Sequence, residues 1–250
     1  MGWLKLVELK SFRLKDGVLV QGLPGIGLVG KIAVDYIISE LKLEKVAELY
    51  SDGLLLPIGN AGVLIDNKAV IKVPRYEFYL YSGSRDILFL TGDVQPVSWA
   101  QYEVANAVLD FFQERGGVEV VAVCGTTAGE EGVKEVYFAA CSPEICEWLK
   151  GLGFKPSEGG TITGACGLLP ALAALRGLKA YALMGTTHRP EPDPEASREI
   201  VKALNKIFGV QVNLENLNRM IEEIKKRQEE FKKFAELIAK ETRRTPSYYV

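Results

Sequence analysis

The chain has 250 residues, of which 48% are hydrophobic and 25% are charged, and its formal net charge is −2. This length suits one large α/β domain or two small ones, each with a real hydrophobic core. Because the net charge is close to zero, the chain lacks the excess of positive charge that binds nucleic acid. No segment approaches the ~18 uninterrupted apolar residues of a membrane span. We therefore expect a cytoplasmic globular protein with no nucleic-acid or membrane partner.

In chain order, residues 18–21 read as a buried strand, residues 22–30 as a glycine-rich turn, and residues 28–41 as a helix. The next stretch alternates short apolar runs with Gly, Asn, Asp and Pro turns, which is typical of strands and hairpins. It predicts strands at 46–50, 54–58, 62–65, 69–73, 78–81 and 87–90.

From residue 98 onward, helical patterns alternate with continuously apolar runs. The predicted helices are 98–115 with Ser98 as N-cap, 142–151, an apolar and hence buried helix at 167–176, and 193–208; the predicted strands are 118–124 and 180–184. Strands that are apolar along their whole length are typical of parallel strands buried on both faces. The alternation favours a three-layer α/β/α sandwich with a mostly parallel central sheet.

Four cysteines, at positions 124, 141, 146 and 166, show no CxxC or Cys/His spacing typical of a metal site. We interpret them as reduced thiols of a cytosolic protein, in neither a disulfide nor a metal site. The single histidine, His188, lies beside a proline-rich loop, and no sequence pattern supplies it with a catalytic partner. We expect it to be a surface residue, and we expect no cofactor and no metal.

The glycine-rich turn permits more than one interpretation. Gly25 to Gly30 fit the G-x-G-x-x-G pattern of a dinucleotide site, and Asp52 follows at a suitable distance. Lys31 extends the match to a phosphate-binding loop, but Ile32 stands where that loop needs a hydroxyl for Mg²⁺. The alternative to a binding protein is therefore a small-ligand or nucleotide-binding enzyme.

The structural interpretation of the same turn is that its glycines allow a strand and a helix to pack closely. Pro24 removes a backbone donor from the start of the turn, which is unusual for a phosphate site. The residues of this structural glycine loop are Gly22, Pro24, Gly25, Gly27 and Gly30.

The C-terminal part of the chain predicts a long helix at 213–240 after an α/β domain at 1–209. Its apolar positions recur at alternating spacings of three and four, as in a heptad seam. The seam consists of Leu214, Leu217, Ile221, Ile224, Gln228, Phe231, Ala235 and Ile238. This helix either forms an oligomer interface, with Gln228 setting the register, or covers its own sheet.

The last segment, 241–250, is predicted to be a flexible tail that ends in Tyr248, Tyr249 and Val250. Two aromatic rings and a terminal carboxylate suit a narrow apolar pocket with a Lys or Arg at its mouth, although the tail could also fold back. The ending resembles the hydrophobic-Tyr-X motif of proteasome activators and assembly factors. They insert this motif between neighbouring α subunits of the 20S particle.

The stretch Gly22-Leu-Pro-Gly-Ile-Gly-Leu-Val-Gly-Lys31 resembles the opening signature of the archaeal proteasome-assembly-chaperone family, relatives of the second eukaryotic proteasome assembly chaperone. Further matches follow at 91–96, 125–129, 161–169 and 180–187. The resemblance implies a fold similar to nucleoside phosphorylases, without enzymatic activity. It also implies 20S proteasome α subunits as partners and a homo-oligomer, tetrameric or pentameric. A paralogue of the same family is a further possible partner.

Overall fold

The computed structural model describes residues 2–188, 191–224 and 226. The chain divides into two compact units, residues 1–212 and 213–250. The first unit contains the sheets and the labelled helices, and residues 215–224 of the second unit are helical. Within the described residues, no helix is both long and apolar enough to cross a bilayer.

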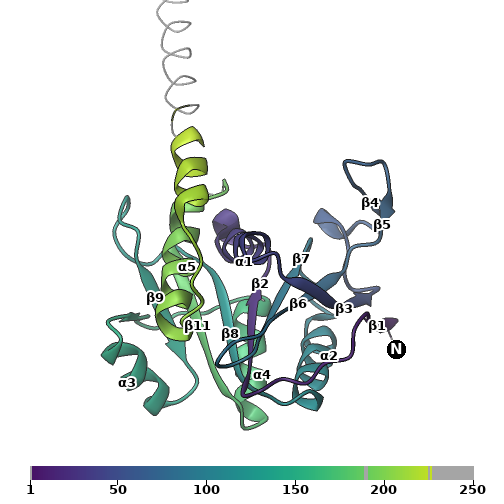
Figure 1. Cartoon of the computed structure of the whole chain (residues 1–250), viewed down its shortest axis with the longest axis horizontal. Coiled ribbons are helices and arrows are strands. Elements are labelled where there is room, and N and C mark those ends of the chain that lie inside the picture. Colours follow the sequence, from purple (N-terminus) through teal and green to yellow (C-terminus); the bar gives the residue numbers. More distant parts are fainter. Residues whose placement is uncertain (1, 189–190, 225, 227–250) are drawn as a thin grey trace, which may run out of the picture. The chain divides into compact units, whose positions relative to one another are not determined.

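The first unit is built on a nine-stranded sheet with the strand order β1-β3-β6-β7-β2-β8-β11-β9-β10 (Figure 1). The strands are β1 (Leu4–Glu8), β2 (Gly17–Gly22), β3 (Glu44–Ser51), β6 (Tyr76–Tyr81), β7 (Ile87–Gly92), β8 (Gly117–Thr126), β9 (Val136–Ala140), β10 (Lys155–Pro156) and β11 (Lys179–Thr186). A separate hairpin consists of β4 (Leu64–Ile65) and β5 (Ile71–Lys72).

The sheet is mixed. The prediction of a mostly parallel sheet is wrong, because only half of the strand pairs are parallel. The neighbours β7, β2, β8 and β11 run parallel, as does the pair β9–β10. The other four pairs, β1–β3, β3–β6, β6–β7 and β9–β11, are antiparallel. Short connections such as the turn between β6 and β7 force antiparallel pairing, because a parallel neighbour needs a long crossover.

Helices cover both faces of this sheet. They are α1 (Val29–Glu40), α2 (Gln101–Glu114), α3 (Pro143–Gly151), α4 (Ala165–Leu175) and α5 (Pro194–Phe208). Helix α1 packs against α5, and α2 packs against α4. In β11, a Cβ on Gly185 would meet Ala196 of α5, whereas Ala182, three residues earlier, clusters with Cys166 of α4. Because successive side chains alternate between faces, the two helix pairs lie on opposite faces and form three layers.

Some of the predicted helix and strand boundaries agree with the structure, and others differ for local reasons. Helices α3 and α5 start where predicted, and there Ser142 and Asp193 act as N-caps, each accepting a bond from the backbone amide three residues on. Ser98 does not cap α2, because Ala100 occupies that position. The strand predicted at 54–58 gives way to a 3₁₀ turn at Pro57–Gly59. The fourth helix is buried on one face only, contrary to the prediction: Ala171 is exposed in its middle, and Leu175 is 84% exposed at its end.

The prediction that all four cysteines are reduced is also wrong. Cys124 and Cys166 form a disulfide, with their Cα atoms 6.3 Å apart. The bond joins the end of β8 to the first turn of α4. No spacing pattern indicated it, since 42 residues separate the two cysteines and only the packing of α4 on β8 brings them together. Cys141 and Cys146 carry free thiols.

Candidate functional site

The glycine loop joins β2 to α1 at the carboxyl end of the parallel strands, the edge where α/β proteins bind ligands. Two of its glycines serve close packing. A Cβ on Gly22 would lie 2.3 Å from the carbonyl oxygen of Gly30, and a Cβ on Gly30 would lie 1.9 Å from that of Val123 in β8. Helix α1 therefore approaches the sheet more closely than any side chain at these positions would allow.

The central glycine, Gly27, is packed against a second loop of the same chain. Its φ angle of +59° lies in the left-handed region, and a Cβ there would be 3.0 Å from Thr187 Oγ1. The carbonyl oxygen of Gly27 accepts a hydrogen bond of 2.8 Å from the Asp193 amide. A dinucleotide site needs this position open for a pyrophosphate, so the geometry favours the structural interpretation of the loop.

Lys31 also behaves differently from the lysine of a phosphate-binding loop. Its Nζ lies 2.7 Å from Asp35 Oδ2 and 3.3 Å from Thr91 Oγ1. These three residues line an open pocket together with Ile38, Glu77, Tyr79, Gly92 and Asp93. Three carboxyl groups against one lysine make the pocket unfavourable for a phosphate-bearing ligand.

Asp193 lies at the centre of a buried polar cluster beside the glycine loop. Its carboxylate pairs with Lys134 Nζ and accepts hydrogen bonds from Thr187 Oγ1 (2.8 Å) and the Ala196 amide (3.1 Å). Burial alone would raise the pKa of Asp193. The hydrogen bonds from Lys134, Ala196 and Thr187 outweigh it and hold that pKa below its usual value. The carboxylate thus fixes β11, α5 and the segment before β9 to one another.

Gln95 joins two further segments at the same edge. Its Nε2 donates to the Pro24 carbonyl oxygen at 2.6 Å, and its Oε1 accepts from the Ala165 amide at 3.1 Å. One side chain thereby connects the start of the glycine loop to the first turn of α4. The loop groups named here therefore bind one another across this edge of the sheet.

We expect Asp193→Asn to lower the free energy of unfolding by ~2 kcal/mol at pH 7, because it removes a buried carboxylate and leaves the half-buried Lys134 ammonium without its counter-charge. Urea unfolding measures this change. The matched control is Glu147→Gln, which breaks an exposed ion pair with Lys150 in α3 and is expected to change stability little or not at all. Equal effects of the two substitutions would contradict the role assigned to Asp193.

The contribution of Asp193 also has a defined pH dependence. Because its folded pKa is depressed, the stabilisation is fully present above the unfolded value of about 3.9. It is lost as the pH falls through the lower folded pKa. The stability difference between the wild type and Asp193→Asn should therefore persist at pH 5 and shrink below about pH 4.

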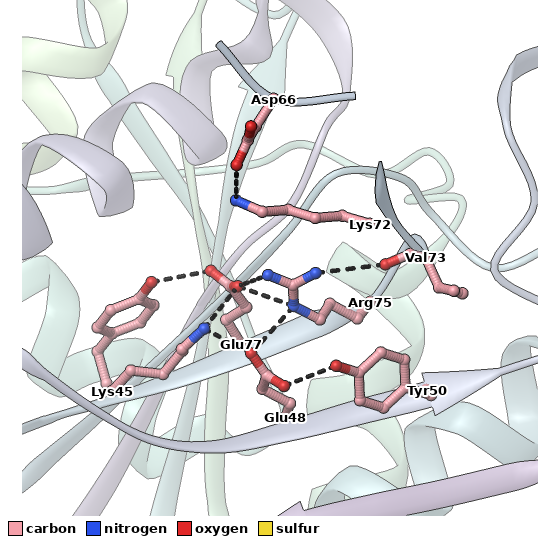
Figure 2. Close-up of polar contacts among 9 residues, drawn as sticks. Lys45, Glu48, Tyr50, Asp66, Lys72, Val73, Arg75 and Glu77 are labelled. Atoms are coloured by element: carbon pink, nitrogen blue, oxygen red, sulfur yellow. Dashed lines mark hydrogen bonds and ion pairs between the residues drawn. The ribbon is translucent and has the colours of Figure 1, made fainter. Parts of the chain in front are cut away.

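A second polar network occupies the sheet face over β3 and β6 (Figure 2). Arg75 Nη2 lies 2.6 Å from Glu77 Oε1, and Arg75 Nε lies 3.1 Å from Glu48 Oε1. Lys45 pairs with both glutamates, and Tyr50 and Tyr79 donate to Glu48 and Glu77. Burial alone would raise the pKa of Glu77, but its hydrogen bonds to Tyr79 and Lys45 hold that pKa below its usual value.

A β-bulge assembles this network. The register shifts between Lys45 and Ala47, so that Lys45 pairs with Tyr79 while Ala47 pairs with Phe78. Without the bulge, Lys45 and Glu48 would point to opposite faces of the sheet, because they are three residues apart. The extra residue brings the ammonium group to the face where Glu48 and Glu77 lie.

The structure covers only part of the predicted partner-binding residues. In the helix at 215–224, Leu217 and Ile221 are buried and Ile224 is half-buried, as is Leu214 just before it. The predicted seam is therefore its least exposed stripe there. Gln228, Phe231, Ala235 and Ile238 lie outside the described residues, as do Tyr248, Tyr249 and Val250. His188 is exposed, as predicted, and the described residues contain no group of three or more His, Cys, Asp or Glu suited to a metal ion.

A comparison with known families matches the PAC2 family over residues 19–232. The chain belongs to the PAC2 family. The resemblance seen in the glycine loop is thereby confirmed. An uncharacterized relative from Methanocaldococcus jannaschii, MJ1210, is 31% identical over 238 residues, which covers 93% of this chain and 90% of the relative.

Two solved structures of Pyrococcus furiosus proteins are similar in sequence and fold. PbaB, described as an archaeal proteasome activator, is 31% identical, with a TM-score of 0.84 over 93% of this chain and 100% of PbaB. PbaA, described as an archaeal homolog of proteasome-assembly chaperone, is 27% identical, with a TM-score of 0.80 over 96% of each chain. The similarity to each of these two structures thus covers more than nine-tenths of this chain.

Sequence reasoning identified the glycine loop but not the groups that pack on it. Asp193 was predicted only as a helix start, although its carboxylate also binds Lys134 and Thr187. Gln95 lies in a segment that contributed to the family resemblance, and that was the one signal available for it. No sequence pattern predicted the network of Figure 2, because its members come together through strand pairing and a bulge.

Proposed function

We propose that this PAC2 family protein binds the 20S proteasome, as an assembly chaperone or as a factor that docks on the α ring. The observation that carries the proposal is the full-length similarity to PbaB, described as a proteasome activator. The crowded glycine loop supports a binding protein over the enzyme alternative. A protein that binds the 20S particle would act in the cytoplasm. The similarity of the fold to that of nucleoside phosphorylases stays a prediction.

The docking element of this proposal is the C-terminal tail. The Tyr248 and Tyr249 rings would fill an apolar pocket between neighbouring α subunits, and the Val250 carboxylate would pair with a lysine there. Ordering a tail costs roughly 1–2 kcal/mol per residue, so one tail alone binds weakly. Several tails on one oligomer would raise the avidity by ~10²–10⁴. The part of the seam beyond Leu217 and Ile221, which are already buried in the single chain, would supply that oligomer, with Gln228 setting its register.

The test is retention of the full-length protein on immobilised 20S α subunits. Deleting Tyr248, Tyr249 and Val250 should weaken retention by at least ~100-fold, because every tail of the oligomer is lost at once. The matched pair is Tyr249→Ala, expected to behave like the deletion, and Val250→Ala, expected to bind normally since it keeps the carboxylate. Unchanged retention of the deletion variant would rule out tail docking.

A further inference from the structure

A small cavity lies between the nine-stranded sheet and the helices α2 and α4. Leu90 of β7, Val104 and Val108 of α2 and Leu169 of α4 form much of its apolar wall. The space open to the centre of a water molecule measures about 10 Å³ there. That volume is close to the least that one buried water needs, and it leaves no room for a much larger molecule.

Two buried polar side chains share this cavity. Gln21 in β2 and Tyr76 in β6 are each 1% exposed, and both line it. Neither Gln21 Oε1 nor Tyr76 Oη has a hydrogen-bond partner among the described residues. Buried polar groups without a partner are rare in folded proteins, because the hydrogen bonds that they made to water in the unfolded chain are not replaced. Two such groups around one cavity indicate a shared partner.

Strand register places both side chains on the same face of the sheet. Gln21 pairs with Leu90 of β7, and Tyr76 pairs with Gly92, two residues further along the same strand. Because side chains alternate between faces, all four positions face the same way. A Cβ on Gly92 would lie 2.5 Å from Tyr76 Cδ1, so the phenol ring leans across β7, which lies between β6 and β2. The glycine thus lets the Tyr76 hydroxyl approach the strand that carries Gln21.

The chemistry of the two atoms defines the ligand that fits between them. The amide oxygen of Gln21 accepts hydrogen bonds, whereas the phenol O–H of Tyr76 can donate one. Burial raises the pKa of Tyr76, so the hydroxyl keeps its proton. The apolar wall makes a charged ligand unfavourable. A small neutral molecule that both donates and accepts at a single atom meets all of these conditions.

We propose that this cavity binds one ordered water molecule, which donates to Gln21 Oε1 and accepts a hydrogen bond from the Tyr76 hydroxyl. The water joins β2 to β6 across the intervening strand β7. Gln101 of α2 is a third polar side chain in the wall, and its Nε2 donates to the Pro96 carbonyl oxygen at 3.4 Å. Buried waters of this kind typically make about three hydrogen bonds. The inference concerns the core of the α/β unit and is independent of proteasome binding.

The sign of a stability change distinguishes a cavity that holds water from a dry one. If the Tyr76 hydroxyl donates to a bound water, Tyr76→Phe removes a hydrogen bond, and the equilibrium constant for unfolding should rise about 10-fold in urea unfolding. If that hydroxyl has no partner, the same substitution removes a buried polar group that is not bonded, and the protein should become more stable. Gln21→Met tests the other partner of the water, and we expect a loss of stability there as well.

Two other tyrosines provide matched controls. Tyr181→Phe removes a buried hydroxyl that donates to Glu119 Oε1 at 2.9 Å, so it shows the loss expected for a bonded phenol. Tyr102→Phe removes a hydroxyl from a side chain that is 63% exposed, and it should change stability little. In the double variant Gln21→Met, Tyr76→Phe, both partners of the water are gone. Because the two groups share one water, the loss in the double variant should be smaller than the sum of the two single losses.

A high-resolution crystal structure of the full-length protein tests the site directly. We expect density for one water within hydrogen-bonding distance of both Gln21 Oε1 and Tyr76 Oη, and no such density in the double variant. Stabilisation of the protein by Tyr76→Phe would overturn the proposal. So would a dry cavity, a direct hydrogen bond between Gln21 and Tyr76, or a larger molecule in the density of the wild type.

Discussion

Replacing Cys124 and Cys166 by alanine is expected to lower the free energy of unfolding by about 4 kcal/mol, as urea unfolding without reductant would measure. The disulfide closes a loop between cysteines that are 42 residues apart, which restricts the unfolded chain. It also fastens the carboxyl end of central strand β8 to the first turn of α4, next to Ala122 and Ala182. Both effects favour the folded state.

The matched control is the replacement of the free Cys141 and Cys146 by alanine, which should change stability much less. Reductant should lower the stability of the wild type toward that of the Cys124→Ala, Cys166→Ala variant and leave the variant unchanged. Titration of denatured, non-reduced protein should detect two thiols per chain. Four reactive thiols in that assay would mean that the disulfide does not form.

Gly30→Ala is expected to destabilise the protein by ~3 kcal/mol or more, even though alanine is the better helix former. Gly30 lies in the first turn of α1, where alanine would normally gain ~0.5–1 kcal/mol. Its Cβ would, however, lie 1.9 Å from the carbonyl oxygen of Val123. That oxygen belongs to the backbone of central strand β8, so α1 must move away from the sheet, and overpacking of this kind costs more than the propensity gains.

The control for this prediction is Gly151→Ala at the end of α3. Among the described residues, no atom beyond its chain neighbours and the backbone of its own helix lies within 4 Å of a Cβ placed there, so we expect no loss and a gain of up to ~1 kcal/mol. Thermal unfolding of the two variants compares helix propensity with close packing directly. Similar melting temperatures for both would show that α1 can shift away from β8 at little cost.

What the sequence revealed about this protein was mostly local. The helix starts at Ser142 and Asp193 were predictable because residues of these types favour the first position of a helix, where their side chains bind an amide three residues away. The apolar runs that became β8 and β11 were predictable because strands buried on both faces need no alternation. The glycine loop was recognisable as a family signature, but its sequence alone could not decide between ligand binding and close packing.

The tertiary structure decided whatever depends on which segments meet. The space beside Gly27 is filled by Thr187 and Asp193, which lie more than 150 residues away along the chain. The disulfide depends on α4 packing on β8, and the ion pairs of Lys45 depend on a bulge in the pairing of β3 with β6. Propensities and caps act over a few residues, whereas these contacts are fixed by strand order, register and helix packing across the whole sheet.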